Sequence, residues 1–127
     1  MRNLEQIRAA NALVVCSETE FKGANNGEVV KKVPAMIRQN GILGAAAFAL
    51  ENQRKTDHAD VFKAIIKHLA TPGINKIEQS CELKEFIEWL TQYPDASSER
   101  LREVTNEAMA YLSYLRRFAN KKRKEKQ

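Results

Sequence analysis

Apolar residues recur at helical spacing along almost the whole chain. The row at 4–14 predicts a first helix at about 3–19. The row at 29–37 is interrupted by Pro34, which removes an amide donor and clashes with the preceding turn. We therefore expect a kink there, or a short turn before a helix that begins at the proline. A third helix is expected at about 42–55.

Three further helices follow. Asp57 is a good N-cap for a fourth helix, which Thr71-Pro72-Gly73 ends. A fifth, shorter helix is closed by Tyr93-Pro94-Asp95. The last helix begins near 97 or 98 and runs to about 120. Its inner row is expected to be Leu101, Val104, Ala108, Leu112, Leu115 and Ala119.

No window alternates apolar and polar residues beside a hairpin turn, so we expect no sheet. The prediction is an all-α fold: a compact single-domain bundle of about six helices over residues 1–120, with a long C-terminal helix. The remaining residues, 121–127, form a basic tail that we expect to be frayed or disordered.

The stretch 37–53, IRQNGILGAAAFALENQ, places two glycines among alanines in the middle of this pattern. Glycine inside a helix costs about 1 kcal/mol relative to alanine, so its presence needs a reason. We expect Gly41 and Gly44 to bracket a turn that reverses the chain between the second and third helices. Gly44 and the neighbouring alanines would also make one helix thin, so that another can approach closely.

Composition and charge narrow the function. With 43% apolar and 29% charged residues, the 127-residue chain is globular, and it has no apolar run long enough to span a bilayer. The net charge of +5 is unevenly distributed along the chain, because the tail 121–127 alone holds five basic residues and one acidic residue. Cys16 and Cys81 lie far apart without a CxxC motif, which favours buried free thiols in a cytoplasmic protein.

No catalytic or metal-binding constellation is recognisable. His58 and His68 are ten positions apart and would project in different directions, so we expect no metal site, no cofactor and no enzymatic activity. The acidic residues of the fifth helix are most simply a solvated face. The aromatic row Tyr111, Tyr114, Phe118 is typical of core packing, with base stacking as a less favoured alternative.

Two groups of basic residues remain as candidate binding residues. Such residues can also relieve a helix dipole or keep a surface soluble, so the sequence alone leaves both interpretations open. The first group surrounds the glycine-containing stretch and the second ends the last helix: Lys31, Lys32, Arg38, Arg54 and Lys55, then Arg116, Arg117 and Lys121.

Three segments together resemble one known family. VKKVPAMIRQNGILGAAAFAL at 30–50 resembles the Lys-Lys-apolar-Pro-Ala…Asn-Gly signature of the small helical subunit of type III-B CRISPR effector complexes, the Cmr complexes. LEQIRAANAL at 4–13 is similar to that family's first helix. TNEAMAYLSYLRRFAN at 105–120 is similar to its closing helix, and the order and spacing match.

The resemblance implies a non-catalytic subunit that stacks in several copies beside the backbone subunit of the complex. Such subunits line a positively charged path along the CRISPR RNA and the target RNA. Arg8, Lys31, Lys32 and Arg117 match family positions, and we add Arg38, Arg54, Arg116 and Lys121 from their charge and placement. The acidic residues Glu78, Glu82, Glu85 and Glu88 would either face a basic end of a neighbouring copy or be solvated.

Two other functions stay open. A helical DNA-binding regulator would need exposed Arg, Asn or Gln at the start of a recognition helix. The helix after Asn40-Gly41 instead offers Ile, Leu, Gly and Ala, which disfavours this function. The second alternative is an adaptor that binds only protein. In isolation we expect a monomer or a weak oligomer, because no helix shows an uninterrupted outer apolar row.

Overall fold

The computed structural model describes residues 3–18, 28–92 and 97–126, with side chains as far as 119. These residues contain five helices and no strand, which confirms the all-α prediction. The expected turn at Tyr93-Pro94-Asp95 lies outside them. The helices are α1 (Leu4–Glu18), α2 (Val29–Glu51), α3 (His58–Leu69), α4 (Leu83–Gln92) and α5 (Ser98–Lys126).

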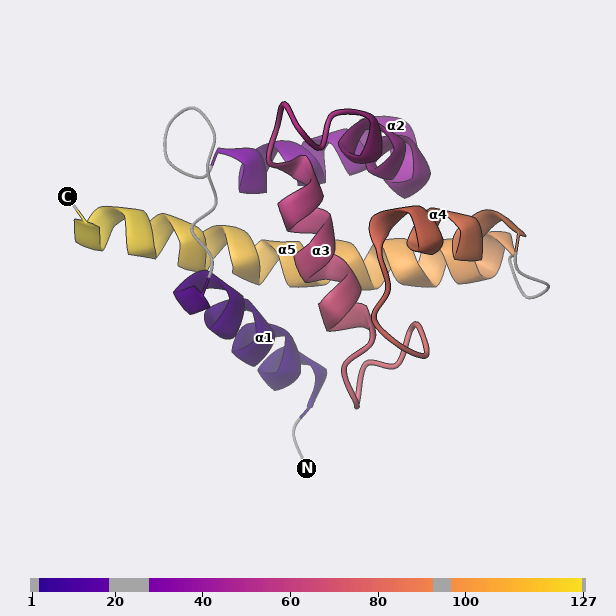
Figure 1. Ribbon diagram of the computed structural model, residues 1–127. Helices are drawn as coiled ribbons and strands as arrows, with labels where there is room; N and C mark the ends of the chain where they lie inside the picture. The colour runs from indigo at the N-terminus through magenta and orange to yellow at the C-terminus, as the bar shows by residue number, and fades with distance from the viewer. Residues whose placement is uncertain (1–2, 19–27, 93–96, 127) are drawn as a thin grey trace.

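The longest helix, α5, crosses the whole molecule, and the other helices are arranged around it (Figure 1). α1 lies along α5 on one side, and α2 and α3 pack against α5 and against each other. α4 packs on α2 and α3. As predicted, Val104, Ala108, Leu112 and Leu115 are buried on the inner face of α5. The helix continues to Lys126, beyond the expected end near 120.

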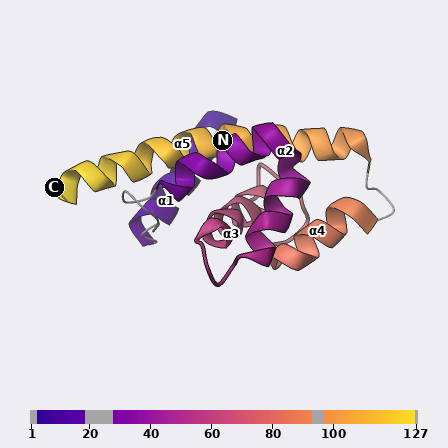
Figure 2. The same cartoon turned by 90° about the horizontal axis from the view of Figure 1, so that it is seen from above.

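The predicted count of about six helices differs from the observed five because two predicted helices are the halves of α2. The backbone leaves the helical conformation at Gly41, where φ is 78° and ψ is 162°. The chain bends at this point instead of reversing, so the expected hairpin is wrong (Figure 2). Pro34 is buried within the first half of α2, and the break lies at the glycine.

The small residues after this bend divide between the core and the surface. Ala45, Ala46 and Ala49 are fully buried, which confirms that this half of α2 allows close packing. Gly44 is exposed, so its expected role in helix contact is wrong. A Cβ atom at Gly44 would lie 3.1 Å from the Cβ of Asn40, across the bend. The glycine therefore relieves crowding within α2 itself.

The predicted apolar row of α1 is partly wrong. Ile7 is buried, but Leu4 and Val14 are each 47% exposed, and Ala12 and Cys16 are buried instead. α1 is therefore rotated about its axis relative to the predicted orientation. The reason is that Arg8 and Asn11 on its inner face bind buried partners on α5 and α3. Among the described residues, no helix is both long and apolar enough to cross a membrane.

Candidate nucleic-acid interface

The first half of α2 carries exposed cations on a well-packed helix. Lys31, Lys32 and Arg38 are exposed, while Val33 and Ile37 on the opposite face are buried. Lys31 and Arg38 are seven residues apart and therefore lie on the same flank, two turns from each other. The row of valines and isoleucine positions these charges by anchoring the helix in the core.

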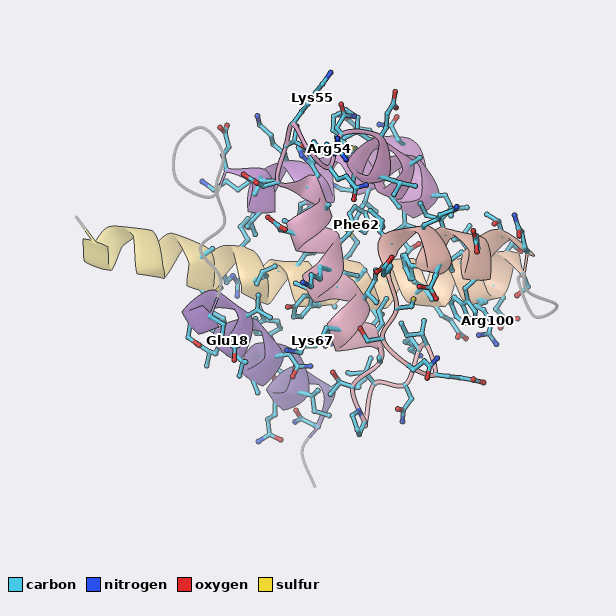
Figure 3. The ribbon with its side chains drawn as sticks, viewed as in Figure 1. Glu18, Arg54, Lys55, Phe62, Lys67 and Arg100 are labelled. Atoms are coloured by element: carbon cyan, nitrogen blue, oxygen red, sulfur yellow. The ribbon has the colours of Figure 1, made fainter. Side chains whose placement is uncertain are left out.

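The turn that follows α2 is fixed by its own hydrogen bonds. The backbone N and the side-chain Nδ2 of Asn52 both donate to the carbonyl of Phe48, at 3.0 and 2.9 Å. The backbone N atoms of Lys55 and Thr56 donate to the carbonyl of Asn52, each at 2.9 Å. Arg54 and Lys55 are exposed on this turn, and Lys55 points away from the helices in Figure 3.

His58, the first residue of α3, connects this turn to the start of α2. Its buried ring meets the Phe48 ring edge-on, with centroids 5.0 Å apart and planes at 68°. Burial, reinforced by the nearby Lys32 ammonium, lowers the pKa of His58 despite the opposing charge of Asp57. α3 begins directly after Asp57, as expected, but the carboxylate makes no capping hydrogen bond.

These residues define the basic side of the molecule: Lys31, Lys32, Arg38, Arg54 and Lys55. None of them forms an ion pair with an acidic side chain in the part of the chain that the structure describes. The sequence from 28 to 70 holds seven basic and four acidic residues, whereas 71–92 holds four acidic and two basic residues. The stretch 28–70 therefore carries a net charge of +3 and the stretch 71–92 a net charge of −2.

The acidic end lies at α4 and the loop before it. Glu78, Glu82, Glu85 and Glu88 are all exposed, as expected. Three of them line an open groove of about 440 Å³ that also contains Phe86 and Trp89. The guanidinium of Arg100 lies 4.8 Å from the centre of the Trp89 ring, which joins the start of α5 to α4.

The second predicted group lies on α5. Arg116 and Arg117 are exposed, and Arg117 is close enough to Tyr114 to affect its pKa. The Tyr114 hydroxyl donates to Glu5 at 3.1 Å, so this neighbourhood is the seam between α1 and α5. The side chain of Lys121 lies outside those described.

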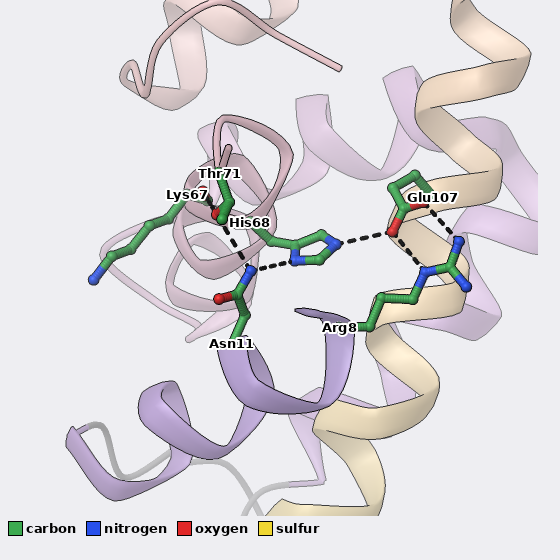
Figure 4. Close-up of polar contacts among 6 residues, drawn as sticks. All are labelled: Arg8, Asn11, Lys67, His68, Thr71 and Glu107. Atoms are coloured by element: carbon green, nitrogen blue, oxygen red, sulfur yellow. Dashed lines mark hydrogen bonds and ion pairs between the residues drawn. The ribbon is translucent and has the colours of Figure 1, made fainter. Parts of the chain in front are cut away.

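Arg8 forms an ion pair within the fold, which the sequence did not indicate. Its Nε donates to Oε2 of Glu107 at 2.8 Å and its Nη2 donates to Oε1 at 2.7 Å (Figure 4). This paired geometry neutralises the guanidinium against a carboxylate that is only 4% exposed. Two of the three guanidinium nitrogens of Arg8, Nε and Nη2, are therefore engaged within the fold, and its side chain is 23% exposed.

The pair belongs to a larger polar cluster, which we name the Glu107 clamp: Arg8 and Asn11 of α1, His68 of α3, the following Thr71, and Glu107 of α5. His68 Nε2 lies 2.9 Å from Glu107, and His68 Nδ1 lies 2.9 Å from the amide Nδ2 of Asn11. A neutral imidazole fits both contacts, because Nε2–H can donate to the carboxylate while Nδ1 accepts from the amide.

The electrostatics of the clamp agree with this protonation state. Burial lowers the pKa of His68 and outweighs the opposing influence of Glu107. Burial opposes ionisation of Glu107, but the hydrogen bonds from Arg8 and His68 offset it, so its pKa is lowered. Tyr111 stacks on His68 with centroids 4.2 Å apart, and burial raises the pKa of this tyrosine.

A family model described as CRISPR-associated protein (Cas_Cmr5) matches residues 4–122. The chain belongs to the Cas_Cmr5 family. The resemblance carried by the three sequence segments is thereby confirmed, and the match extends from α1 well into α5. No curated protein and no solved structure matches the chain closely enough to be counted.

The aromatic residues of this Cas_Cmr5 chain differ in what they can contact. Tyr111 is fully buried and therefore cannot stack on a base, and Tyr114 and Phe118 are half-buried. Phe48 is 38% exposed at the basic side, and sequence reasoning missed it. Its signal was available: Phe48 is out of register with the row formed by buried Ala45 and Ala49 and their neighbours.

The histidine, cysteine and acidic side chains bear on metal binding and thiol chemistry. Within the described ranges, no group of three or more His, Cys, Asp or Glu side chains could hold a metal ion. Neither Cys16 nor Cys81 forms a disulfide within the described residues; Cys16 is buried, as expected, but Cys81 is half-buried. Burial, together with the charge of Glu85, raises the pKa of Cys81, which disfavours the reactive thiolate.

Proposed function

We propose that this Cas_Cmr5 chain is the non-catalytic small subunit of a type III-B CRISPR complex and binds the backbone of the guide or target RNA. The observation that carries the proposal is the basic side, where exposed cations extend from a packed helix and a hydrogen-bonded turn. The same chain neutralises Arg8 internally but leaves these cations without acidic partners among the described residues.

Phosphate binding fits the chemistry of these residues. Lysine and arginine side chains neutralise phosphates without reading base sequence, and their binding releases counterions. A subunit that follows a guide of any sequence needs this kind of contact and no base-reading code. Cleavage of the target would then belong to other subunits, and we expect this chain to act in the cytoplasm.

The partners proposed are the backbone subunit of the complex and neighbouring copies of this chain. Segregated charge supports contact between copies, because the acidic groove at α4 could face a basic surface of the next copy. Exposed charge pairs alone contribute little affinity, so we expect the isolated chain to be a monomer or a weak oligomer.

The test compares two triple variants that each remove three positive charges. The test variant replaces Lys31, Lys32 and Arg54 of the basic side with alanine. The control variant replaces three basic residues that lie on or near α4 and α5: Lys76, Lys84 and Arg102. RNA binding is measured by fluorescence anisotropy between about 50 and 300 mM salt, with the full chain and with the assembled complex.

The test variant should bind RNA more weakly, and its log–log salt slope should fall by about 0.7 to 0.9 for each lost phosphate contact. Surface substitutions usually change stability by less than about 0.5 kcal/mol, so both variants should stay folded. Single variants Arg116→Ala and Arg117→Ala and removal of 121–127 separate the α5 group from the basic side. If removing the tail abolished RNA affinity while the test variant bound normally, the adaptor function would replace this proposal.

A further inference from the structure

Phe48 is 38% exposed, whereas every other phenylalanine, tyrosine and tryptophan among the described side chains is half-buried or buried. Its neighbours on the core-facing side of α2, Ala45 and Ala49, are fully buried, so the ring stands on the outer edge of the helix. Leaving an aromatic ring exposed forgoes the burial that usually stabilises it. Sites for single-stranded nucleic acid commonly combine accessible aromatic rings with cations that bind phosphates.

Two contacts hold Phe48 in place. The ring packs edge-on against His58, with centroids 5.0 Å apart. Its carbonyl accepts two hydrogen bonds from Asn52, which fix the start of the next turn relative to the phenylalanine. Because the ring and the turn are already ordered, a ligand that stacks here would lose little affinity to the cost of ordering them.

Basic residues follow Phe48 along the chain, and another lies near its ring partner His58. Arg54 and Lys55 project from the turn that is tied to Phe48, and Lys32 of α2 lies close enough to His58 to lower its pKa. A ring with neighbouring cations matches the two components of a nucleotide, a flat base and a charged phosphate. In a duplex the base faces are already stacked on each other, so only an unpaired nucleotide presents both components.

We propose that Phe48 stacks against the base of an unpaired RNA nucleotide whose adjoining phosphates are bound by Arg54 and Lys55. This rests on the proposed function and deepens it, because it adds a preference for unpaired RNA over duplex at one defined position. His58 supports the ring from the side and stays uncharged, since burial and Lys32 both lower its pKa. The stack is independent of base identity because every base has an aromatic face.

Three substitutions of Phe48 separate stacking from simple burial. Phe48→Ala removes the ring, Phe48→Leu keeps an apolar side chain without an aromatic face, and Phe48→Trp keeps a stacking surface. Leu13→Ala is the matched control, because Leu13 is an exposed apolar residue of α1, outside the basic side. The probes are a fluorescein-labelled single strand of 15 uridines and an RNA duplex of 15 base pairs, and thermal unfolding checks each variant's fold.

Alanine and leucine should each weaken binding of the single strand by about 5- to 100-fold, whereas tryptophan should retain it. The salt slope should not change, because no charge is lost, and duplex binding should change by less than about twofold. A single 2-aminopurine in the strand should lose fluorescence on binding to the natural chain and not to Phe48→Leu. Leu13→Ala should bind both probes like the natural chain.

Several results would overturn this proposal. Wild-type binding by Phe48→Leu would show that no base stacks on the ring, and equal losses for strand and duplex would show an effect without stacking. Loss of assembly with the other subunits at unchanged RNA affinity would identify a protein-docking residue instead. These failures leave the proposed function in place when the Lys31, Lys32 and Arg54 variant still binds RNA weakly. If that variant also binds RNA normally, the proposed function fails as well.

Discussion

Replacing the buried Glu107 should destabilise the protein far more than replacing an exposed glutamate of α5. Its carboxylate is 4% exposed and accepts two hydrogen bonds from Arg8 and one from His68. In Glu107→Ala the guanidinium and the imidazole N–H lose their acceptor at the same time. The variant therefore removes the polar contacts through which Arg8 of α1 and His68 of α3 bind α5.

The expected loss follows from the burial of the pair. Removing one member of a buried ion pair typically costs about 3 to 5 kcal/mol, because the other charge is left without a partner. The side chain of Arg8 is 23% exposed and can regain some hydration, so we expect the lower part of this range, about 3 kcal/mol. For a chain of 127 residues, this corresponds to a fall in melting temperature of about 10 to 15 °C.

Urea and thermal unfolding followed by circular dichroism at 222 nm measure this loss. Glu103→Ala is the matched control, because Glu103 is an exposed glutamate one turn earlier on α5, and it should change stability by less than about 0.5 kcal/mol. The double variant Arg8→Met with Glu107→Leu should recover part of the loss, since no unpaired charge remains. A loss below about 1 kcal/mol in Glu107→Ala would refute the reasoning, because it would mean that the clamp contributes nothing beyond an exposed ion pair.

Three further predictions concern pH, glycines and thiols. Stability should fall as pH drops below about 6.5, because burial lowers the pKa of His68 in the folded state and protons then bind preferentially to the unfolded chain. In His68→Gln, the free energy of unfolding should therefore change less between pH 7 and pH 5. Gly41→Ala should lower the free energy of unfolding in urea by about 1 to 3 kcal/mol, because a φ of 78° suits glycine alone. Gly44→Ala should cost less, because the higher helix propensity of alanine, worth about 1 kcal/mol, offsets the close contact of its Cβ with Asn40. Alanine at both Cys16 and Cys81 should leave RNA binding unchanged, and loss of binding with an intact fold would require a redox role.

The sequence predicted the helices well where apolar spacing alone decides them. The rows on α3 and α5 correspond to buried faces in the structure, because nearly all of their inner positions are apolar. In α1 the same rule failed. The inner face there includes Arg8 and Asn11, whose partners are on α3 and α5, and a spacing rule that counts only apolar residues cannot register them.

The break at Gly41 could be located from the sequence, but its direction could not. Glycine after asparagine indicates a position with positive φ, and this is what the structure has. Whether the chain then reverses or bends depends on ψ and on what the second half of α2 packs against. Those contacts come from α3 and α4, later in the chain. The position of the bend can therefore be predicted from the sequence, whereas its angle is set by tertiary packing.

The candidate site was predictable to the extent that long charged side chains are exposed by default. Lys31, Lys32, Arg38 and Arg54 are exposed for this reason. The segregation of charge between residues 28–70 and the acidic end was also present in the sequence. The sequence alone cannot predict which basic side chain forms an internal ion pair, because the acidic partner is distant in the chain, as Glu107 is from Arg8.

Arg8 shows why such a partner decides function. Moving its guanidinium to an RNA phosphate would leave the buried Glu107 carboxylate with His68 alone, at a cost of about 3 to 5 kcal/mol. A hydrogen bond to a charged group contributes about 1.5 to 3 kcal/mol, and an exposed ion pair less. The exchange is unfavourable, so Arg8 stays in the clamp. Arg8 is thus held by an anion within the fold, whereas Lys31, Lys32, Arg116 and Arg117 are exposed and form no ion pair among the described residues.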